Sequence, residues 1–302
     1  MSQPPLDGDT VPAKLPDALH SGMICAVAAQ GQRDLQECAN VYSDLFPAKP
    51  FDPAVFSTLA LANAFSAPWL PADRLRMANR ASLWAFRVDW LVDYLAASRS
   101  EVDDAATRCL AVADGSAPAV GDSLAAFLAT LRDDLNSQPA FADLHTIWRD
   151  ELRRMFEAMT REFEWRSAGA TITAITAEEY LNNADNLGSS FVNVTHWIAN
   201  SEPSTPEHVA DVLTATRAQQ QVLRLLNDLG TYHRDLSWGD LNLLRLGVTE
   251  KEVTEWMADL GERCELALRP LRNRQPRMAV FLERQMEFCR GFYGITDYWG
   301  SL

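Results

Sequence analysis

The sequence predicts an all-α fold, a single domain of about ten helices. Apolar residues recur at helical spacing through most of the chain after residue 18, and strand-type alternation is scarce. Only 14 glycines are spread over the 302 residues, so hairpin signals are rare. No break in composition divides the chain. We therefore expect residues 19–302 to form one helical domain, for which a hydrophobic content of 47% provides a core.

The first half of the chain contains an expected arm followed by long helical stretches. Residues 1–18 are rich in proline and aspartate and lack apolar periodicity, so we expect a disordered arm. Residues 70–98 form a long amphipathic stretch with Pro71 near its start, where a helix tolerates proline. Residues 121–135 show the same periodicity, and residues 141–168 place apolar and aromatic side chains at helical spacing.

The second half continues in helices, one of which has a recognisable start. The segment 176–199 opens with Thr176 and Glu179, whose spacing fits a capping box at a helix N-terminus. Three further helical stretches follow, at 204–237, 248–271 and 276–299. The connections between them are short and polar, which favours packing of neighbouring helices against each other.

Charge and cysteine usage exclude several classes of protein. A nucleic-acid partner would need a basic face, and the formal net charge of −14 argues against one, so we expect no nucleic-acid partner. The five cysteines are far apart and form no CxxC pair, which argues against a disulfide framework and favours a reducing, cytoplasmic location. The first residues show no apolar signal-peptide core, and no run of 18 apolar residues suggests a membrane span.

Two aspartates stand in the otherwise apolar stretch from Phe86 to Tyr94. Asp89 and Asp93 are four residues apart, so on a helix they share one face. Two stacked carboxylates repel each other unless a cation lies between them, and Mg²⁺ prefers carboxylate oxygens. The alternative is a pair of solvated aspartates on an outer face, which is the more common situation for this spacing when it occurs alone.

A stripe of three oxygen-bearing side chains follows an apolar segment near residue 230. Asn227, Thr231 and Asp235 recur every fourth residue on one helix face and could chelate one hard cation. Arg234 lies beside the stripe, where it could donate hydrogen bonds to an anionic group on that metal. Asp228 is rotated off the stripe and is interpreted as structural. A solvated polar helix face remains the alternative on spacing alone.

The two patterns together resemble the metal-binding motifs of class I terpene synthases. That family's first motif is aspartate-rich, DDxxD or DDxxxD, and its second is NDxxSxxxE with a basic residue just before the last acid. The order and spacing of the motifs and helices match over about residues 20–299. The resemblance implies that the metal ligands are Asp89, Asp93, Asn227, Thr231 and Asp235. It also implies that Arg234 binds diphosphate.

The resemblance implies a helical bundle around a central cavity, where three Mg²⁺ ions help an isoprenoid diphosphate to lose its diphosphate group. Asp89 and Asp93 are then catalytic. So is Gly188, the expected point of irregular backbone in a broken helix whose carbonyl dipoles face the cation. An aromatic cup would stabilise and shield that cation. The candidates for this substrate-binding cup are Trp84, Phe86, Phe191, Tyr293 and Trp299. Ordinary core packing is the alternative for each of them.

The chain departs from the family pattern in several places. Trp90 stands where a second aspartate is usual, and Asp235 replaces a glutamate. Typical bacterial sesquiterpene synthases carry a diphosphate-sensing arginine four residues after the tyrosine of the broken helix. Here the residue four positions after Tyr180 is Ala184. The same enzymes often end in an Arg-Tyr pair, whereas this chain ends in TDYWGSL.

The segment EYLNNADNLGSS resembles instead the bacterial kaurene-synthase-like and labdane-related diterpene synthases, which also lack that arginine. This resemblance implies a bicyclic C20 substrate, copalyl diphosphate or a relative, supplied by a class II diterpene cyclase. The expected product is a labdane-related diterpene such as a labdatriene, with a kaurene-type skeleton or a hydroxylated labdane as alternatives. A homodimer is a further expectation from the family.

Three alternatives stay open. The first is a class I cyclase that acts on linear geranylgeranyl or farnesyl diphosphate. The second is a chain-elongating prenyl transferase, which would carry two aspartate-rich motifs, whereas the second motif here is NDxxTxxxD. The third is a catalytically degenerate all-α homologue, for which the departures at Trp90 and Ala184 would be compatible.

Overall fold

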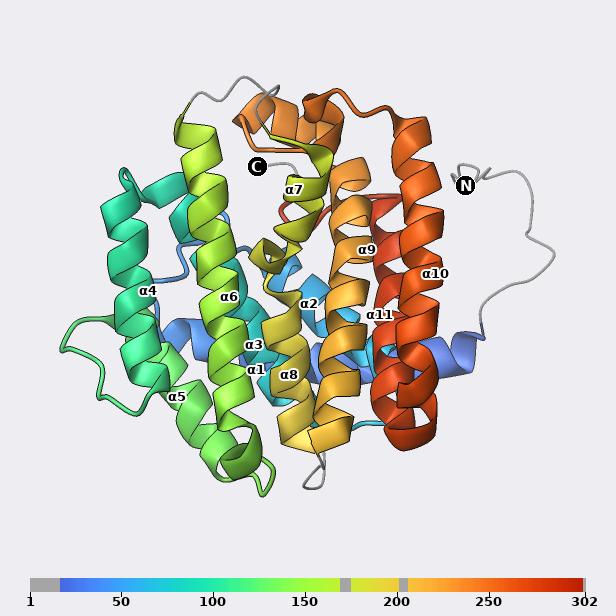
Figure 1. Ribbon diagram of the computed structural model, residues 1–302. Coiled ribbons are helices and arrows are strands. Elements are labelled where there is room, and N and C mark those ends of the chain that lie inside the picture. Colours follow the sequence, from blue (N-terminus) through green and yellow to red (C-terminus); the bar gives the residue numbers. More distant parts are fainter. Residues whose placement is uncertain (1–16, 169–174, 201–205, 301–302) are drawn as a thin grey trace.

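The computed structural model describes residues 17–168, 175–200 and 206–300, and over these residues the chain folds into eleven α-helices with no strand (Figure 1). This confirms the predicted all-α fold. The α-helices are α1 (Ala18–Val41), α2 (Pro53–Ser66), α3 (Ala72–Trp90), α4 (Arg99–Ala113), α5 (Ser123–Asn136), α6 (Phe141–Ser167), α7 (Ala177–Asn182), α8 (Ser189–Asn200), α9 (Pro206–Trp238), α10 (Glu250–Arg274) and α11 (Pro276–Tyr293). The shorter elements are the π-helical η1 (Leu91–Leu95) and the 3₁₀-helical η3 (Ala184–Leu187) and η4 (Leu243–Leu246).

The helix starts follow local chemistry. Asp17 accepts hydrogen bonds from two backbone N–H groups at the start of α1, so of the arm expected at 1–18 only residues 1–16 lie outside the described residues. Thr176 and Glu179 form the predicted capping box at the start of α7, with both reciprocal hydrogen bonds present. Helix α9 begins at Pro206, where the missing N–H of proline costs no helical bond.

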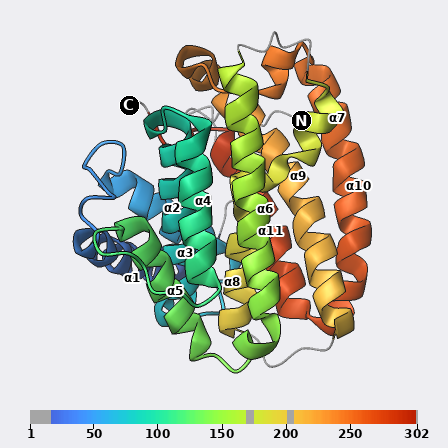
Figure 2. The same ribbon diagram turned by 60° about the vertical axis from the view of Figure 1, so that its left-hand side comes forward.

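Five helices close a ring around the centre of the protein. Helix α3 packs against α8, α8 against α9, α9 against α11, α11 against α2, and α2 against α3. Outside the ring, α1 packs on α2 and α3, α6 on α8, and α10 on α9 and α11. Figure 2 shows α1 and α10 at opposite edges of the bundle. None of the described helices has a stretch both long and apolar enough to span a bilayer.

Two predicted helices end or change earlier than their periodicity suggests. The stretch predicted as helix over 70–98 is α3 followed by the π-helical turn η1, in which the N–H of Ala96 donates to the carbonyl of Leu91 at 2.8 Å. Such wide turns concentrate at functional sites. The stretch predicted over 276–299 stops at Tyr293, and the segment after it turns back over the ring. Hydrophobic periodicity alone does not mark either change, because apolar residues continue through both.

Candidate active site

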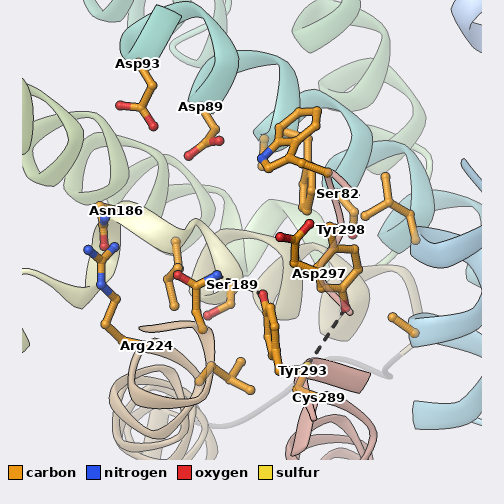
Figure 3. A pocket seen from close by; sticks show the side chains of 18 of the residues that line it. Ser82, Asp89, Asp93, Asn186, Ser189, Arg224, Cys289, Tyr293, Asp297 and Tyr298 are labelled. Atoms are coloured by element: carbon orange, nitrogen blue, oxygen red, sulfur yellow. Dashed lines mark hydrogen bonds between the residues drawn. The ribbon is translucent and has the colours of Figure 1, made fainter. Parts of the chain in front are cut away.

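A cavity lies inside the ring of five helices, and all five contribute to its wall (Figure 3). The centre of a water molecule can occupy about 180 Å³ of it. Charged side chains in the wall come from the end of α3, from η1, α6 and α9, from the loop after α9 and from the C-terminal segment. Apolar and aromatic side chains come from α2, α3, α8, α9 and α11, from the broken helix, from the loop after α9 and from the C-terminal segment. The cavity wall therefore combines charged and apolar side chains, which suits an organic ligand that has both a charged and an apolar part.

The two predicted aspartates of the first motif both line this cavity. Asp89 lies in the last turn of α3, and Asp93 lies in η1, where the wider π turn follows. Asp89 has no hydrogen-bond or ion-pair partner among the described residues. Burial raises its pKa to about 7, and the negative charge of Asp240 adds to the increase. Asp89 thus faces the cavity without an ion-pair partner in direct contact, and the positive charges of Arg234 and Arg224 act on it only from a distance.

Asp93 differs from Asp89 because it has a partner. Nη1 of Arg166 donates to Oδ1 of Asp93 at 2.8 Å and also lies 3.6 Å from Oδ1 of Asp240. Burial, followed by the charge of Asp89, still holds the pKa of Asp93 well above its usual range. The hydroxyl of Tyr94 donates to the other oxygen of Asp240 at 2.5 Å. One guanidinium and one phenol therefore connect the end of α3 to the loop after α9.

Trp90 occupies the place of the missing aspartate and is not part of the cavity wall. Its ring lies 4.3 Å from the ring of Tyr94, 5.5 Å from that of Trp299 and 6.5 Å from that of Trp238, centroid to centroid. The side chain thus joins an aromatic cluster between η1, the end of α9 and the C-terminal segment. A carboxylate at this position would face apolar rings, which explains why an aromatic residue fits.

The three predicted ligands of the second motif lie together on α9. Asn227 and Asp235 line the cavity, whereas Thr231 is buried and does not reach the wall. The hydroxyl of Thr231 lies 2.6 Å from Oδ2 of Asp235 and 2.8 Å from the carbonyl of Asn227. Asp235 also accepts a hydrogen bond from Asn242 at 2.8 Å. The side-chain oxygens of Thr231 and Asp235 therefore bond to each other, whereas the side-chain amide of Asn227 donates to the hydroxyl of Tyr293 at 3.1 Å.

Arg234 lies in the cavity wall beside this stripe. Nη2 donates to Oδ1 of Asp235 at 3.0 Å, and Nη1 lies 3.2 Å from Oδ2 of Asp297 in the C-terminal segment. Asp235, followed by Asp297, keeps the pKa of Arg234 above its usual value even though burial opposes this. Arg234 is consequently a fixed cation that ties the end of α9 to the C-terminal segment.

The broken helix contributes the irregular backbone that was expected around Gly188. Helix α7, η3 and α8 replace one continuous helix, and Gly188 has a φ of +67° between η3 and α8. A Cβ atom on Gly188 would lie 2.8 Å from Sδ of Met155 and 3.3 Å from Cβ of Ala85. Its neighbours Leu187 and Ser189 line the cavity. Both the backbone angle and the close packing therefore require glycine here.

Three of the five predicted cup residues line the cavity, and two do not. Phe86, Tyr293 and Trp299 are part of the wall. Trp84 is fully buried behind it and donates from Nε1 to the carbonyl of Leu124 at 3.0 Å. Phe191 packs against Trp84 at 5.6 Å between ring centroids. Trp84 precedes Phe86 by two residues and is therefore turned by about 200° around the helix axis. The prediction that Trp84 and Phe191 form the cup is corrected: they support its wall from outside.

Several wall residues were not predicted from the sequence. Glu162 on α6, Arg224 on α9 and Asp240 after α9 bring charges to the cavity, and Asp297 and Tyr298 come from the C-terminal segment. Arg224 precedes Asn227 by one helical turn, so the periodicity of the stripe could have indicated it. Asp240 follows the positive-φ turn at the end of α9, and its position has no local sequence signal.

The donor set suits a hard divalent cation. It consists of carboxylate, amide and hydroxyl oxygens on two facing walls, and Asp89 forms no direct ion pair with a described residue. Among the described residues, no three acidic, histidine or cysteine side chains already stand at metal-binding spacing. The second motif includes only one carboxylate, and Arg166 lies between Asp93 and Asp240. The residues therefore fit a metal that arrives together with an anionic ligand.

Known proteins resemble the chain in both sequence and structure. A family model described as terpene synthase family 2, C-terminal metal binding, matches residues 81–265, which include both motifs. The chain is 26% identical over 283 residues to ent-pimara-9(11),15-diene synthase from Streptomyces sp. (strain KO-3988), across 91% of this chain and 93% of that protein.

Two solved structures share the fold. One is 2-methylisoborneol synthase from Streptomyces coelicolor A3(2), solved with Mg²⁺ and 2-fluoroneryl diphosphate. Its TM-score is 0.76 at 15% identity, over 97% of this chain and 96% of that chain. The other is linalool/nerolidol synthase from Streptomyces clavuligerus, with a TM-score of 0.68 at 17% identity, over 89% of this chain and 94% of that chain. At these identities the likeness establishes the fold alone.

Proposed function

The chain belongs to terpene synthase family 2, and from this premise we propose that it ionises a bicyclic, labdane-type C20 diphosphate such as copalyl diphosphate. Membership makes it a class I terpene synthase, a lyase with a metal-binding site. The main support for this ionisation chemistry is the carboxylate of Asp89, which has no direct partner and lines the same cavity as Asn227 and Asp235. Cleavage of the C–O bond leaves a carbocation and diphosphate, with the bonding electron pair on diphosphate.

We propose Mg²⁺ as the metal, with three ions as the resemblance to class I enzymes implies. Asp89 and Asp93 would hold it on one wall, and Asn227, Thr231 and Asp235 on the other. A metal bound there would supply positive charge to the diphosphate oxygens and so stabilise the charge that develops as the C–O bond breaks. Binding requires the hydrogen bond between Thr231 and Asp235 to open, because both oxygens are ligand atoms.

The chain's own side chains orient the substrate and protect the cation. Arg234 donates charged hydrogen bonds to the departing diphosphate from a position that Asp235 and Asp297 already fix. Phe86 and Trp299, 5.2 Å apart between ring centroids, present aromatic faces to the cation and exclude water. Loss of a proton to diphosphate then yields a neutral diterpene.

Two features support a C20 substrate over a shorter one. The curated relative at 26% identity has the name of a diterpene synthase. The broken helix carries Ala184 where typical bacterial sesquiterpene synthases have an arginine, as in the labdane-related enzymes that it resembles. A bicyclic substrate requires a class II diterpene cyclase to act upstream. A homodimer is part of the same proposal.

Product analysis with defined substrates tests this function. Purified protein with Mg²⁺ is incubated separately with isomers of copalyl diphosphate, with geranylgeranyl diphosphate alone or with a class II cyclase, and with farnesyl diphosphate. We expect a diterpene from a copalyl diphosphate isomer, and from geranylgeranyl diphosphate only when the class II cyclase is present. Fast turnover of farnesyl diphosphate alone would refute the bicyclic substrate. A folded protein that releases no diphosphate from any of them would be the degenerate homologue.

A further inference from the structure

The broken helix lacks an arginine at the position where many relatives have one, but a different arginine enters the cavity nearby. Ala184 is buried in η3, and its methyl side chain carries no charge that could contact an anion. Arg224 on α9 lines the cavity, and only 5% of its surface is exposed. Figure 3 shows its side chain reaching toward Asn186 of the broken helix, on the side of the cavity opposite Asp89 and Asp93. A buried arginine thus faces the first metal motif.

Three elements hold the guanidinium of Arg224 in place. Nε donates to the hydroxyl of Tyr180 on α7 at 2.7 Å, and Nη2 donates to Oε1 of Glu162 on α6 at 3.1 Å. Asp228, one turn later on α9, lies 3.5 Å from Nε. Burial acts against the charge of Arg224, but Glu162, followed by Tyr180 and Asp228, outweighs it and holds the pKa well above its usual range. Arg224 is consequently a permanent cation in a fixed orientation.

One edge of the Arg224 guanidinium makes no hydrogen bond among the described residues. Nη1 of Arg224 donates to no group among the described residues, although Nε and Nη2 each have partners. Nη1 is not completely buried and keeps some accessible surface. Because the guanidinium is planar, fixing Nε and Nη2 also fixes the direction of Nη1. The free N–H groups are therefore pre-oriented for an acceptor within the cavity.

The position of Arg224 relative to the second motif indicates the kind of acceptor. Arg224 lies one helical turn before Asn227, on the same face of α9 as Asn227 and Asp235. An anion bound between the two metal motifs would lie within reach of this face. Arg234 is beside Asp235, two turns beyond Asn227, so the two arginines flank the motif along the helix. A group with several oxygens suits such a pair of charged donors.

We propose that Arg224 binds the diphosphate group through Nη1, supplying from α9 the charged hydrogen bonds that Ala184 cannot supply from the broken helix. This inference rests on the proposed diphosphate chemistry, but not on the identity of the hydrocarbon part. Glu162, Tyr180 and Asp228 position Arg224, and Nη1 contacts the ligand. The same fixed geometry preorganises the donor, so little reorganisation is needed when the C–O bond breaks.

Binding of inorganic diphosphate in the presence of Mg²⁺, measured by calorimetry, tests the proposal. The variants are Arg224→Gln, Arg224→Lys and the control Arg154→Gln. Arg154 also pairs with the broken helix, through Asp185 at 2.6 Å, but does not line the cavity. We expect Arg224→Gln to weaken diphosphate binding by about 10- to 100-fold, as loss of a charged hydrogen bond does. Arg224→Lys should recover part of the loss, and Arg154→Gln should bind as the unchanged protein does.

The outcomes separate this role from a structural one. A folded Arg224→Gln protein with unchanged diphosphate affinity would overturn the proposal, because Arg224 would then only anchor α9. If that variant does not fold, Arg224→Lys decides: weaker binding supports the proposal, and unchanged affinity overturns it. Inorganic diphosphate has no hydrocarbon part, so failure here leaves the copalyl diphosphate experiment unaffected. Conversely, turnover of farnesyl diphosphate would refute the C20 substrate without changing the expected behaviour of Arg224.

Discussion

Asp89 and Asp93 belong to one motif, yet the structure predicts that asparagine is better tolerated at position 89 than at position 93. Each substitution removes one negative charge and keeps the shape of the side chain. Asp89 has no partner among the described residues, whereas Asp93 accepts a 2.8 Å hydrogen bond from Arg166. Metal-dependent turnover should nevertheless fall for Asp89→Asn, because the lost oxygen charge is the one that faces the cavity without a direct ion-pair partner.

The magnitudes follow from these partners. For Asp93→Asn, loss of the charged hydrogen bond from Arg166 costs about 1–3 kcal/mol of the free energy of unfolding. Relief from burial of the charge and from the repulsion of Asp89, which together raise the pKa of Asp93, offsets part of this loss. For Asp89→Asn, the free energy of unfolding should stay the same or rise by up to about 2 kcal/mol, because an unpaired, buried carboxylate is unfavourable. Turnover with Mg²⁺ should fall by about 100-fold or more for Asp89→Asn, by analogy with other losses of charge stabilisation in transition states.

Urea unfolding of the metal-free proteins at pH 8, together with diphosphate release at saturating Mg²⁺, measures both effects on the same samples. If Asp89→Asn lost as much stability as Asp93→Asn, Asp89 would have a structural partner and its assignment as a free ligand would be wrong. Full turnover by a folded Asp89→Asn protein would remove Asp89 from the metal site altogether.

Three further predictions concern backbone, pH and the cavity wall. Gly188→Ala should lower the free energy of unfolding by about 1–3 kcal/mol in urea and also reduce turnover, because a positive φ disfavours alanine and its Cβ would meet Met155. Burial lowers the pKa of His196 from 6.5 to about 3, so between these values only the unfolded chain takes up this proton and stability falls as the pH falls. At pH 5 the loss is about 2 kcal/mol, and urea unfolding at pH 5 and 7.5 should show that His196→Gln has the smaller pH dependence. Phe86→Ala should change the product mixture seen by gas chromatography. Trp84→Ala should instead cost about 3–5 kcal/mol in the same urea assay.

Features decided by neighbouring residues could be predicted from the sequence. The capping box at Thr176 and Glu179 needs only two side chains three residues apart, and it forms as expected. The break near Gly188 is also local, because a glycine in an otherwise helical stretch permits the positive φ that the structure has. The stripe of Asn227 and Asp235 keeps its common face because α9 remains helical across it.

Features decided by the orientation of a helix could not be predicted in the same way. Trp84 and Phe86 are both aromatic residues on an apolar helix, and sequence does not reveal which of them faces the cavity and which the core. In the structure α3 is covered by other helices on most sides, so nearly all of its middle is buried and its periodicity does not single out the cavity face. The π turn after Trp90 could not be predicted from the sequence either, since apolar residues continue through it.

Features decided by contacts between distant segments carried the least sequence signal. Glu162, Arg224 and Tyr180 come from three helices and meet only in the folded chain. Asp240 reaches the cavity because Gly239 ends α9 with a φ of +86° and turns the chain back. No spacing rule connects these residues. Their pairing follows from the packing of α7 and η3 against α9 and of η3 against α6.

The C-terminal segment brings an acid into the cavity wall. Asp297 forms an ion pair with Arg234 at 3.2 Å while Trp299 lines the cavity. A carboxylate does not bind diphosphate, so Asp297 offers the anionic group no contact of its own. The C-terminal segment can, however, hold Arg234 in position and cover the hydrocarbon part of a substrate. Diphosphate must then share Arg234 with Asp297 or displace Asp297 from Arg234. Binding of diphosphate and placement of the C-terminal segment are therefore interdependent.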